Sequence, residues 1–176
     1  FKNVDVKRRA GSAADRVVLD FDVLEQPTGE LSFGAGYSTA EGIIGDISLS
    51  ERNLFGKGQF VRVKLSGSLE RFQIDLSYTE PRFLDRNIAA GFDLFHKDAN
   101  QSTYSTYRYK RTGGSLRLGF PLAESLWLST NYTLSRDEIY DVVTSNANGR
   151  VASRAIIEAQ GETMTSSVGA GLTYDG

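Results

Sequence analysis

The chain has 176 residues, and its 20 lysines and arginines against 22 aspartates and glutamates give a formal net charge of −2, which excludes a generally basic nucleic-acid-binding protein. The absence of cysteine excludes a disulfide framework, a zinc–cysteine cluster and thiol catalysis. No run of residues approaches the ~20 apolar positions of a membrane-spanning helix, so a chain of this kind crosses a membrane only with strands.

Residues 1–26 differ in pattern from the rest of the chain. Apolar and polar residues alternate in 1–7 and, in part, in 17–25, with a turn between them at 8–15. We predict that this segment is the last hairpin of a small α+β domain and that residues 27–29 form a linker. A plain N-terminal hairpin belonging to the same sheet as the following strands is the alternative.

From residue 30 onward, short segments alternate apolar side chains with small or polar ones, a period typical of strands. The clearest segment is 31–38, with Leu, Phe, Ala and Tyr on one side and Ser and Gly on the other. A soluble sheet buries its apolar face in a core, whereas an outer-membrane barrel turns that face to lipid and its polar face to a wet lumen. The eight predicted strands lie at 30–38, 42–51, 61–66, 72–79, 89–94, 104–120, 126–134 and 167–174.

The polar faces carry charges of both signs at mid-strand, which are costly in a dry core unless each is paired. These charges are Asp46, Arg62, Lys64, Asp75, Asp93 and Arg117. A hydrated lumen removes that cost, although a soluble antiparallel sheet with its polar face in water shows similar alternation. Compact turns at 53–58, 80–83 and 121–124 alternate with longer polar connections at 97–103 and 137–165, which adds support for a barrel. We therefore predict an all-β fold, an antiparallel transmembrane β-barrel.

Three segments together form a recognisable signature: Gly34-Ala35-Gly36-Tyr37-Ser38 followed by Gly42, then Asn53-Leu54-Phe55-Gly56-Lys57-Gly58, then Glu80-Pro81-Arg82-Phe83. In this order and spacing, nearly the whole chain resembles the BamA family, within a POTRA-plus-barrel superfamily that includes TamA and the mitochondrial sorting protein. The resemblance implies that residues 1–26 end the last POTRA domain, that 27–29 are the linker, and that 30–176 are the N-terminal half of a barrel, about eight strands. Because the chain starts at Phe1 and stops where a strand is turning, we expect missing sequence at both ends.

The resemblance also implies a function, the folding and insertion of β-barrel proteins into the bacterial outer membrane without ATP. The implied partners are unfolded outer-membrane β-barrel substrates, BamD-like accessory lipoproteins, periplasmic chaperones, and outer-membrane lipid and lipopolysaccharide, but no nucleic acid. The N-terminal part would lie in the periplasm. The implied periplasmic turn motif consists of Asn53, Leu54, Phe55, Gly56, Gly58, Glu80, Pro81, Arg82 and Phe83.

The first barrel strand has to pair with the last strand to close the barrel, so its outer edge is the seam. Its small residues leave little side-chain packing to hold that seam, and an opened edge exposes N–H and C=O groups that template an incoming strand. The alternative is that its glycines are only small lumen residues. The predicted strand-pairing site consists of Leu31, Ser32, Phe33, Gly34, Ala35, Gly36, Tyr37 and Ser38.

The segment 104–111 mixes aromatic and cationic residues at the outer end of a strand. Such a mixture suits single-stranded nucleic acid, but on a barrel we predict that Arg108 and Lys110 contact the phosphates of lipopolysaccharide. A solvated strand extension is the alternative. Without a bulge at 113–114, Arg108 and Lys110 point outward with Leu116; with a bulge, the neighbouring tyrosines do.

Enzymatic chemistry finds no support in the sequence. No Gly-x-Ser-x-Gly turn occurs, and 56–58 lacks the rest of a phosphate-binding loop. His96 is the only histidine, so we expect a surface residue there, and no enzyme, metal or cofactor. Two other functions stay open: a TamA-like or two-partner secretion transporter, and a small structural eight-strand barrel.

Overall fold

The computed structural model describes residues 3–12, 15–24, 27–100, 105–145 and 151–175. Strands β1 (Asn3–Ala10) and β2 (Val17–Leu24) form a two-stranded antiparallel sheet of their own. The predicted turn at 8–15 is shorter than expected, because cross-strand pairs between Arg9 and Asp20 and between Lys7 and Asp22 continue the hairpin toward its tip. Alternation alone does not reveal such charge-paired strand ends.

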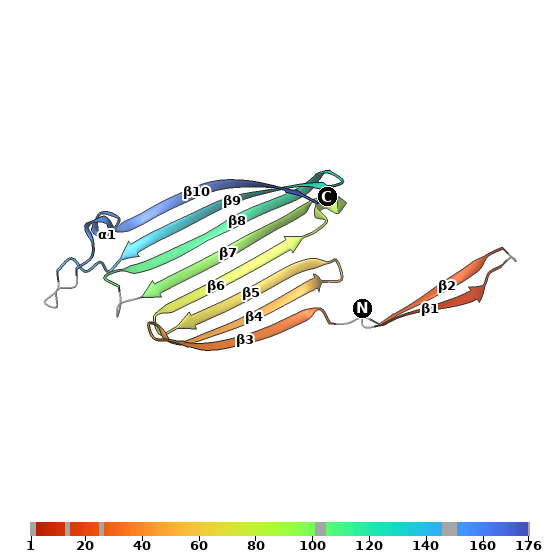
Figure 1. The fold of residues 1–176 in the computed structure, drawn as a ribbon, viewed down its shortest axis with the longest axis horizontal. Helices are drawn as coiled ribbons and strands as arrows, with labels where there is room; N and C mark the ends of the chain where they lie inside the picture. Colours follow the sequence, from red (N-terminus) through yellow and green to blue (C-terminus); the bar gives the residue numbers. More distant parts are fainter. Residues whose placement is uncertain (1–2, 13–14, 25–26, 101–104, 146–150, 176) are drawn as a thin grey trace.

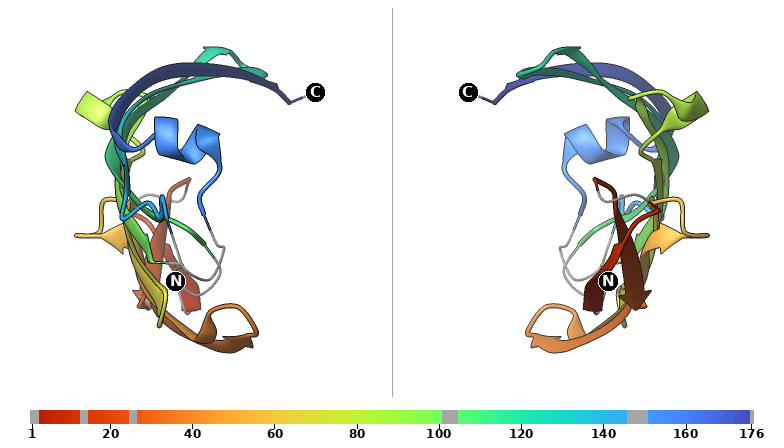
Figure 2. Two further views of the ribbon diagram at one scale, coloured as in Figure 1. Left: turned by 90° about the vertical axis from the view of Figure 1, so that its left-hand side faces the viewer. Right: turned by 90° about the vertical axis from the view of Figure 1, so that its right-hand side faces the viewer.

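The remaining strands form one eight-stranded antiparallel sheet in which every strand pairs with its neighbours in the sequence. Figure 1 shows this meander, and Figure 2 shows that the sheet curves into an open arc. The predicted all-β antiparallel fold is confirmed. The strands are β3 (Gly29–Ser38), β4 (Gly42–Leu54), β5 (Gln59–Ser68), β6 (Arg71–Glu80), β7 (Ala89–Asn100), β8 (Arg108–Ala123), β9 (Leu126–Tyr140) and β10 (Gly161–Tyr174).

Several strands extend beyond their predicted ends into segments that the sequence pattern assigns to loops. β7 extends to Asn100, into the polar connection predicted at 97–103, whereas β8 begins at Arg108, four residues later than the start predicted for the strand 104–120. β9 and β10 shorten the connection predicted at 137–165 to 141–160. The turn predicted at 121–124 is smaller, since β8 runs through a bulge to Ala123. Ion pairs across the strands, including Lys110 with Glu138 and Arg136 with Glu162, extend the ladder where apolar alternation has stopped.

Two short helical segments interrupt the meander, η1 (Phe83–Asp85) between β6 and β7 and α1 (Arg154–Glu158) between β9 and β10. No helix among the described residues is long and apolar enough to cross a bilayer. The β9–β10 connection is hydrogen-bonded to the β7–β8 connection, where Val143 N–H donates to the Thr106 carbonyl, and within itself, where Ala152 N–H donates to the Val143 carbonyl. Figure 2 places α1 on the concave side of the arc.

The polar face of the sheet is its concave face. Four described residues are buried, namely Ala99, Gly119, Ser135 and Ala152, and the first three lie in the polar rows of β7, β8 and β9. The connection that carries Ala152 covers the concave side, so the polar rows face inward and the apolar rows face outward.

The convex face is apolar and uncovered. Phe33 is 73% exposed, Leu116 63% and Val168 80%, and similar side chains follow one another across neighbouring strands in register. On this face the Tyr78 and Phe92 rings pack with their centroids 5.5 Å apart. A continuous apolar face of this size is unfavourable in water and typical of strands facing hydrocarbon.

Candidate functional site

All eight residues of the predicted strand-pairing site lie on β3, at one edge of the sheet (Figure 1). β3 pairs with β4 along its whole length, from Gly29 opposite Glu51 to Ser38 opposite Gly42. Among the described residues, no strand pairs with its other side. In an antiparallel ladder, about half of the N–H and C=O groups of an edge strand point away from its partner. Among the described residues, β3 therefore has an unpaired row of donors and acceptors, as does β10 at the opposite edge of the sheet.

The concave side of β3 is nearly bare. The Asp46 carboxylate reaches across from β4 and lies over Gly34, where an added Cβ would be 2.3 Å from its Oδ1 atom. A Cβ added at Gly36 would meet no atom within 4 Å. On the convex side, Phe33 and Tyr37 are about three-quarters exposed. The side chains of β3 thus leave access to its free edge unobstructed.

The predicted turn motif at 53–58 forms a compact, hydrogen-bonded turn between β4 and β5. Asn53 accepts two bonds, from Gly56 N–H to its carbonyl at 3.0 Å and from Gly58 N–H to its side-chain Oδ1 at 2.7 Å. Gly56 and Gly58 adopt φ of 72° and 70°, which glycine tolerates without strain. Phe55 shares this left-handed conformation, with φ of 56°. The motif residues thus fix the shape of this turn.

Two carboxylates organise the chain next to the turns. Glu51 accepts hydrogen bonds from Thr28 Oγ1 and from the Asn53 N–H. Glu80 accepts hydrogen bonds from the Gln59 side chain and from the Arg82 N–H. Glu51 and Glu80 lie at the end of the sheet that carries the β4–β5 turn and the β6–β7 loop, which we call the turn end. These charged acceptors connect the linker, the β4–β5 turn and the β6–β7 loop to the sheet.

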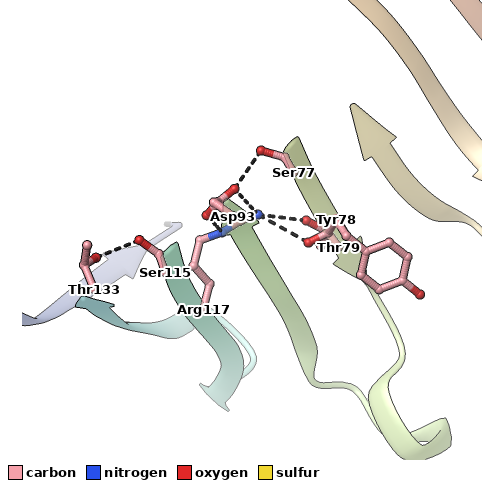
Figure 3. A network of polar contacts seen from close by, with 7 residues as sticks. All are labelled: Ser77, Tyr78, Thr79, Asp93, Ser115, Arg117 and Thr133. Atoms are coloured by element: carbon pink, nitrogen blue, oxygen red, sulfur yellow. Dashed lines mark hydrogen bonds and ion pairs between the residues drawn. The ribbon is translucent and has the colours of Figure 1, made fainter. Parts of the chain in front are cut away.

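A polar network crosses the concave face between β6, β7 and β8, as Figure 3 shows. The Arg117 guanidinium forms an ion pair with Asp93, with Nε 2.7 Å from Oδ2, and its Nη2 donates to Thr79 Oγ1 at 3.2 Å. Ser77 Oγ donates to Asp93 Oδ1 at 2.6 Å. Arg117 reaches β6 by passing over Gly91, where an added Cβ would lie 3.1 Å from Nη2 and 2.6 Å from the Tyr78 carbonyl oxygen.

Arg108 and Lys110, the predicted lipopolysaccharide contacts, lie in the outward-facing row that contains Leu116. β7 and β8 stay in register through 113–114, so the alternative without a bulge holds. Both cations already have acidic neighbours: Arg108 Nη1 is 3.1 Å from Asp141 Oδ2, and Lys110 Nζ is 3.8 Å from Glu138 Oε2. Lys110 also lies 4.9 Å from the Tyr140 ring centroid.

His96 lies in the same outward row, and its Nδ1 is 2.6 Å from Thr112 Oγ1. Within the described part of the chain, no group of three or more His, Asp or Glu side chains is arranged to hold a metal ion.

Comparison with known proteins places these features in a family. A family model described as the Omp85 superfamily domain matches residues 53–176. The chain belongs to the Omp85 superfamily. Its Omp85 domain therefore contains the 53–58 turn, the Arg117 network and strands β5 to β10.

The predicted similarity to BamA is also confirmed. The chain is 32% identical over 126 residues to the outer membrane protein assembly factor BamA of Neorickettsia risticii, covering 72% of this chain and 17% of the relative. It is 31% identical over 177 residues to BamA of Nitratidesulfovibrio vulgaris, covering 99% of this chain and 21% of the relative. The crystal structure of Haemophilus ducreyi BamA lacking POTRA domains 1–3 shares the fold, with a TM-score of 0.66 and 20% identity over all of this chain and 35% of that one. The chain thus spans about a fifth of the length of these curated relatives.

Sequence analysis of this Omp85 chain assigned Asp93 and Arg117 to the polar face but did not pair them. It also missed the role of Gly91. The pairing depends on the register between β6, β7 and β8, which places Gly91 between Thr79 and Arg117. Once the register is known, a glycine that lies opposite an arginine on one neighbouring strand and a threonine on the other predicts an arginine–threonine contact across it.

Proposed function

We propose that this chain is part of an outer-membrane protein that folds and inserts other β-barrel proteins into the bacterial outer membrane. The relatives it matches over 72% and 99% of its length are outer membrane protein assembly factors. The observation that supports the proposal is the edge of β3, which is unpaired on one side among the described residues and carries the small residues Ser32, Gly34, Gly36 and Ser38 on its concave face.

The proposed mechanism is strand addition. An unpaired N–H or C=O group in hydrocarbon costs several kcal/mol, because no water is present to satisfy it. An incoming substrate strand that pairs with β3 removes that cost for both edges at once, and its side chains alternate to lipid and lumen in the same register. The work is done by backbone pairing, so the proposal includes no covalent step and no cofactor.

We place the protein in the outer membrane, with residues 1–26 as the end of a POTRA domain on the periplasmic side. There they would meet unfolded substrates, chaperones and accessory lipoproteins. At the other end of the strands, Arg108 and Lys110 would meet lipopolysaccharide. Because both cations already have carboxylate neighbours, a lipopolysaccharide phosphate would compete with Asp141 for Arg108 and with Glu138 for Lys110.

Disulfide crosslinking to a stalled substrate tests the strand-pairing proposal. In the full-length protein, Ser32→Cys and Ser38→Cys on β3 should crosslink to cysteines in the terminal strand of a barrel substrate arrested during assembly. Ser66→Cys is the matched control, since Ser66 also faces the concave side but lies on β5, which is paired on both sides. Crosslinks at Ser66 and none on β3 would reject the mechanism.

Depletion of the full-length protein tests the broader role. An assembly factor is expected to reduce the amounts of all outer-membrane barrels together. Loss of one secreted or translocated client, with normal barrels, would instead identify a transporter of the same superfamily.

A further inference from the structure

Large apolar side chains stand exposed on the turns at one end of the sheet, beyond the apolar rows of the strands. Phe55 in the β4–β5 turn is 83% exposed, and Leu84 in η1 is 74% exposed. Leu122 near the β8–β9 turn is half exposed as well. Figure 2 shows the β4–β5 turn and η1 projecting from the convex side of the arc. These turns therefore continue the apolar convex face at its end.

The backbone at both tips is held in a conformation that disfavours bulky residues. Phe55 and Leu84 have φ of 56° and 57°, in the left-handed region where glycine or asparagine is usual. Local hydrogen bonds hold each tip: Gly56 N–H donates to the Asn53 carbonyl and Arg86 N–H to the Phe83 carbonyl.

Three cations, Lys57, Arg82 and Arg86, flank these apolar tips. Within the described part of the chain none of them forms a direct ion pair, although Lys57 interacts electrostatically with Glu80. Lys57 and Arg82 line one cavity with Phe83 and Leu84; Glu80 and Asp85 also border it, and Glu80 already accepts hydrogen bonds from Gln59 and Arg82 N–H.

At the opposite end of the sheet, where Leu69 in the β5–β6 turn is also exposed, most cations are paired with carboxylates. The pairs are Arg71–Glu41, Arg108–Asp141, Lys110–Glu138 and Arg136–Glu162. At the end that carries the β4–β5 and β6–β7 turns, three cations without a direct ion pair lie beside the exposed apolar tips, and Arg52 pairs with Glu30. Apolar side chains beside lysine and arginine match the boundary between acyl chains and anionic headgroups.

We propose that the β4–β5 and β6–β7 turns insert Phe55 and Leu84 into the membrane interface and bind anionic phospholipid headgroups through Lys57, Arg82 and Arg86. We assign this surface to lipid for two reasons. The turns continue the convex face that meets lipid, and their positive charges complement the negative charges of anionic headgroups. The inference requires only that the convex face meets lipid. It does not depend on strand pairing at β3, so failure of one proposal leaves the other standing.

Depth-sensitive fluorescence quenching tests this contact. The full-length protein, with Phe55→Cys or Leu84→Cys as its only cysteine, carries an environment-sensitive dye and is refolded into phosphatidylcholine vesicles. A small fraction of the lipid is either brominated phosphatidylcholine or brominated phosphatidylglycerol. We expect bromolipid to quench both dyes and iodide in the water to quench them weakly. Phosphatidylglycerol should quench severalfold more than phosphatidylcholine at equal fraction, and less so at high salt.

Charge-matched variants separate the two ends of the sheet. The triple variant Lys57→Gln, Arg82→Gln, Arg86→Gln should lose the preference for phosphatidylglycerol, whereas Arg71→Gln, Lys110→Gln, Arg136→Gln should keep it. Strong iodide quenching without bromolipid quenching would overturn the proposal, because the tips would then stand in water. Protection from both quenchers would overturn it in favour of a protein partner. Equal quenching by the two lipids would overturn the headgroup assignment. The two dye positions are independent, so one variant that fails to fold leaves the other to decide.

Discussion

The absence of one side chain, at Gly91, permits a polar contact between Arg117 on β8 and Thr79 on β6 across the intervening strand β7. Arg117 passes over Gly91 to reach β6, and an added Cβ would lie 2.6 Å from the Tyr78 carbonyl oxygen, a backbone atom that cannot rotate away. Gly91→Ala should therefore destabilise the folded protein by about 1–3 kcal/mol, as overpacking does. Gly45→Ala is the control, since its nearest neighbour would be 4.0 Å away. Urea unfolding of vesicle-refolded protein measures both, and equal stabilities would show that Arg117 does not need the gap.

The ion pair that this gap permits is partly exposed, so its contribution should be modest. The side chains of Arg117 and Asp93 are 42% and 28% exposed, which screens their attraction. A double-mutant cycle with Arg117→Gln and Asp93→Asn should give a coupling free energy of about 0.5–1 kcal/mol. Zero coupling in urea unfolding would mean that lumen water replaces the contact fully.

At the scale of a single element, Asn53 determines the shape of the β4–β5 turn. Its side-chain oxygen accepts the Gly58 N–H at 2.7 Å, and removing that acceptor costs about 1 kcal/mol. Asn53→Ala should lower the unfolding free energy by this amount and open the turn to protease, whereas Asn53→Asp keeps an oxygen in place and should restore resistance. Equal cleavage of both variants would contradict the role of the side chain.

The strands also show how much of the fold the sequence pattern predicts. Period-two alternation located all eight barrel strands, since lipid and lumen select opposite side chains at successive residues. It missed the outer ends of β9 and β10, because Asp137 and Glu138 are held there by Tyr109 and Lys110 on the next strand. It identified β3 as an edge from its place as the first strand. It could not pair Arg117 with Asp93, because alternation assigns each residue to a face but does not fix the register of β8 against β7.

At the scale of the whole molecule, the decisive property is the solvent that the convex face meets. Leu65 and Ser66 are neighbours on β5 that point to opposite faces: Leu65 lies between Ile47 and Ile74 in the apolar rows, and Ser66 lies opposite Asp46 and Gln73 in the polar rows. In water, an arginine replacing a partly exposed leucine is nearly neutral. In hydrocarbon, the same change destabilises a barrel by about 2–4 kcal/mol near the midplane and by less toward the interfaces.

Leu65→Arg should therefore lower the unfolding free energy of the vesicle-refolded protein by a few kcal/mol, depending on its depth in the bilayer. Ser66→Arg should change it by about 0.5 kcal/mol or less, because the lumen is wet and Asp46 stands opposite. Urea titration of the two variants gives the comparison, with folding of each checked by protease resistance. If the signs were exchanged, so that Leu65→Arg were neutral and Ser66→Arg costly, the polar rows would be the enclosed ones. The strand-pairing edge of β3 would then have no hydrocarbon to make its unpaired groups costly.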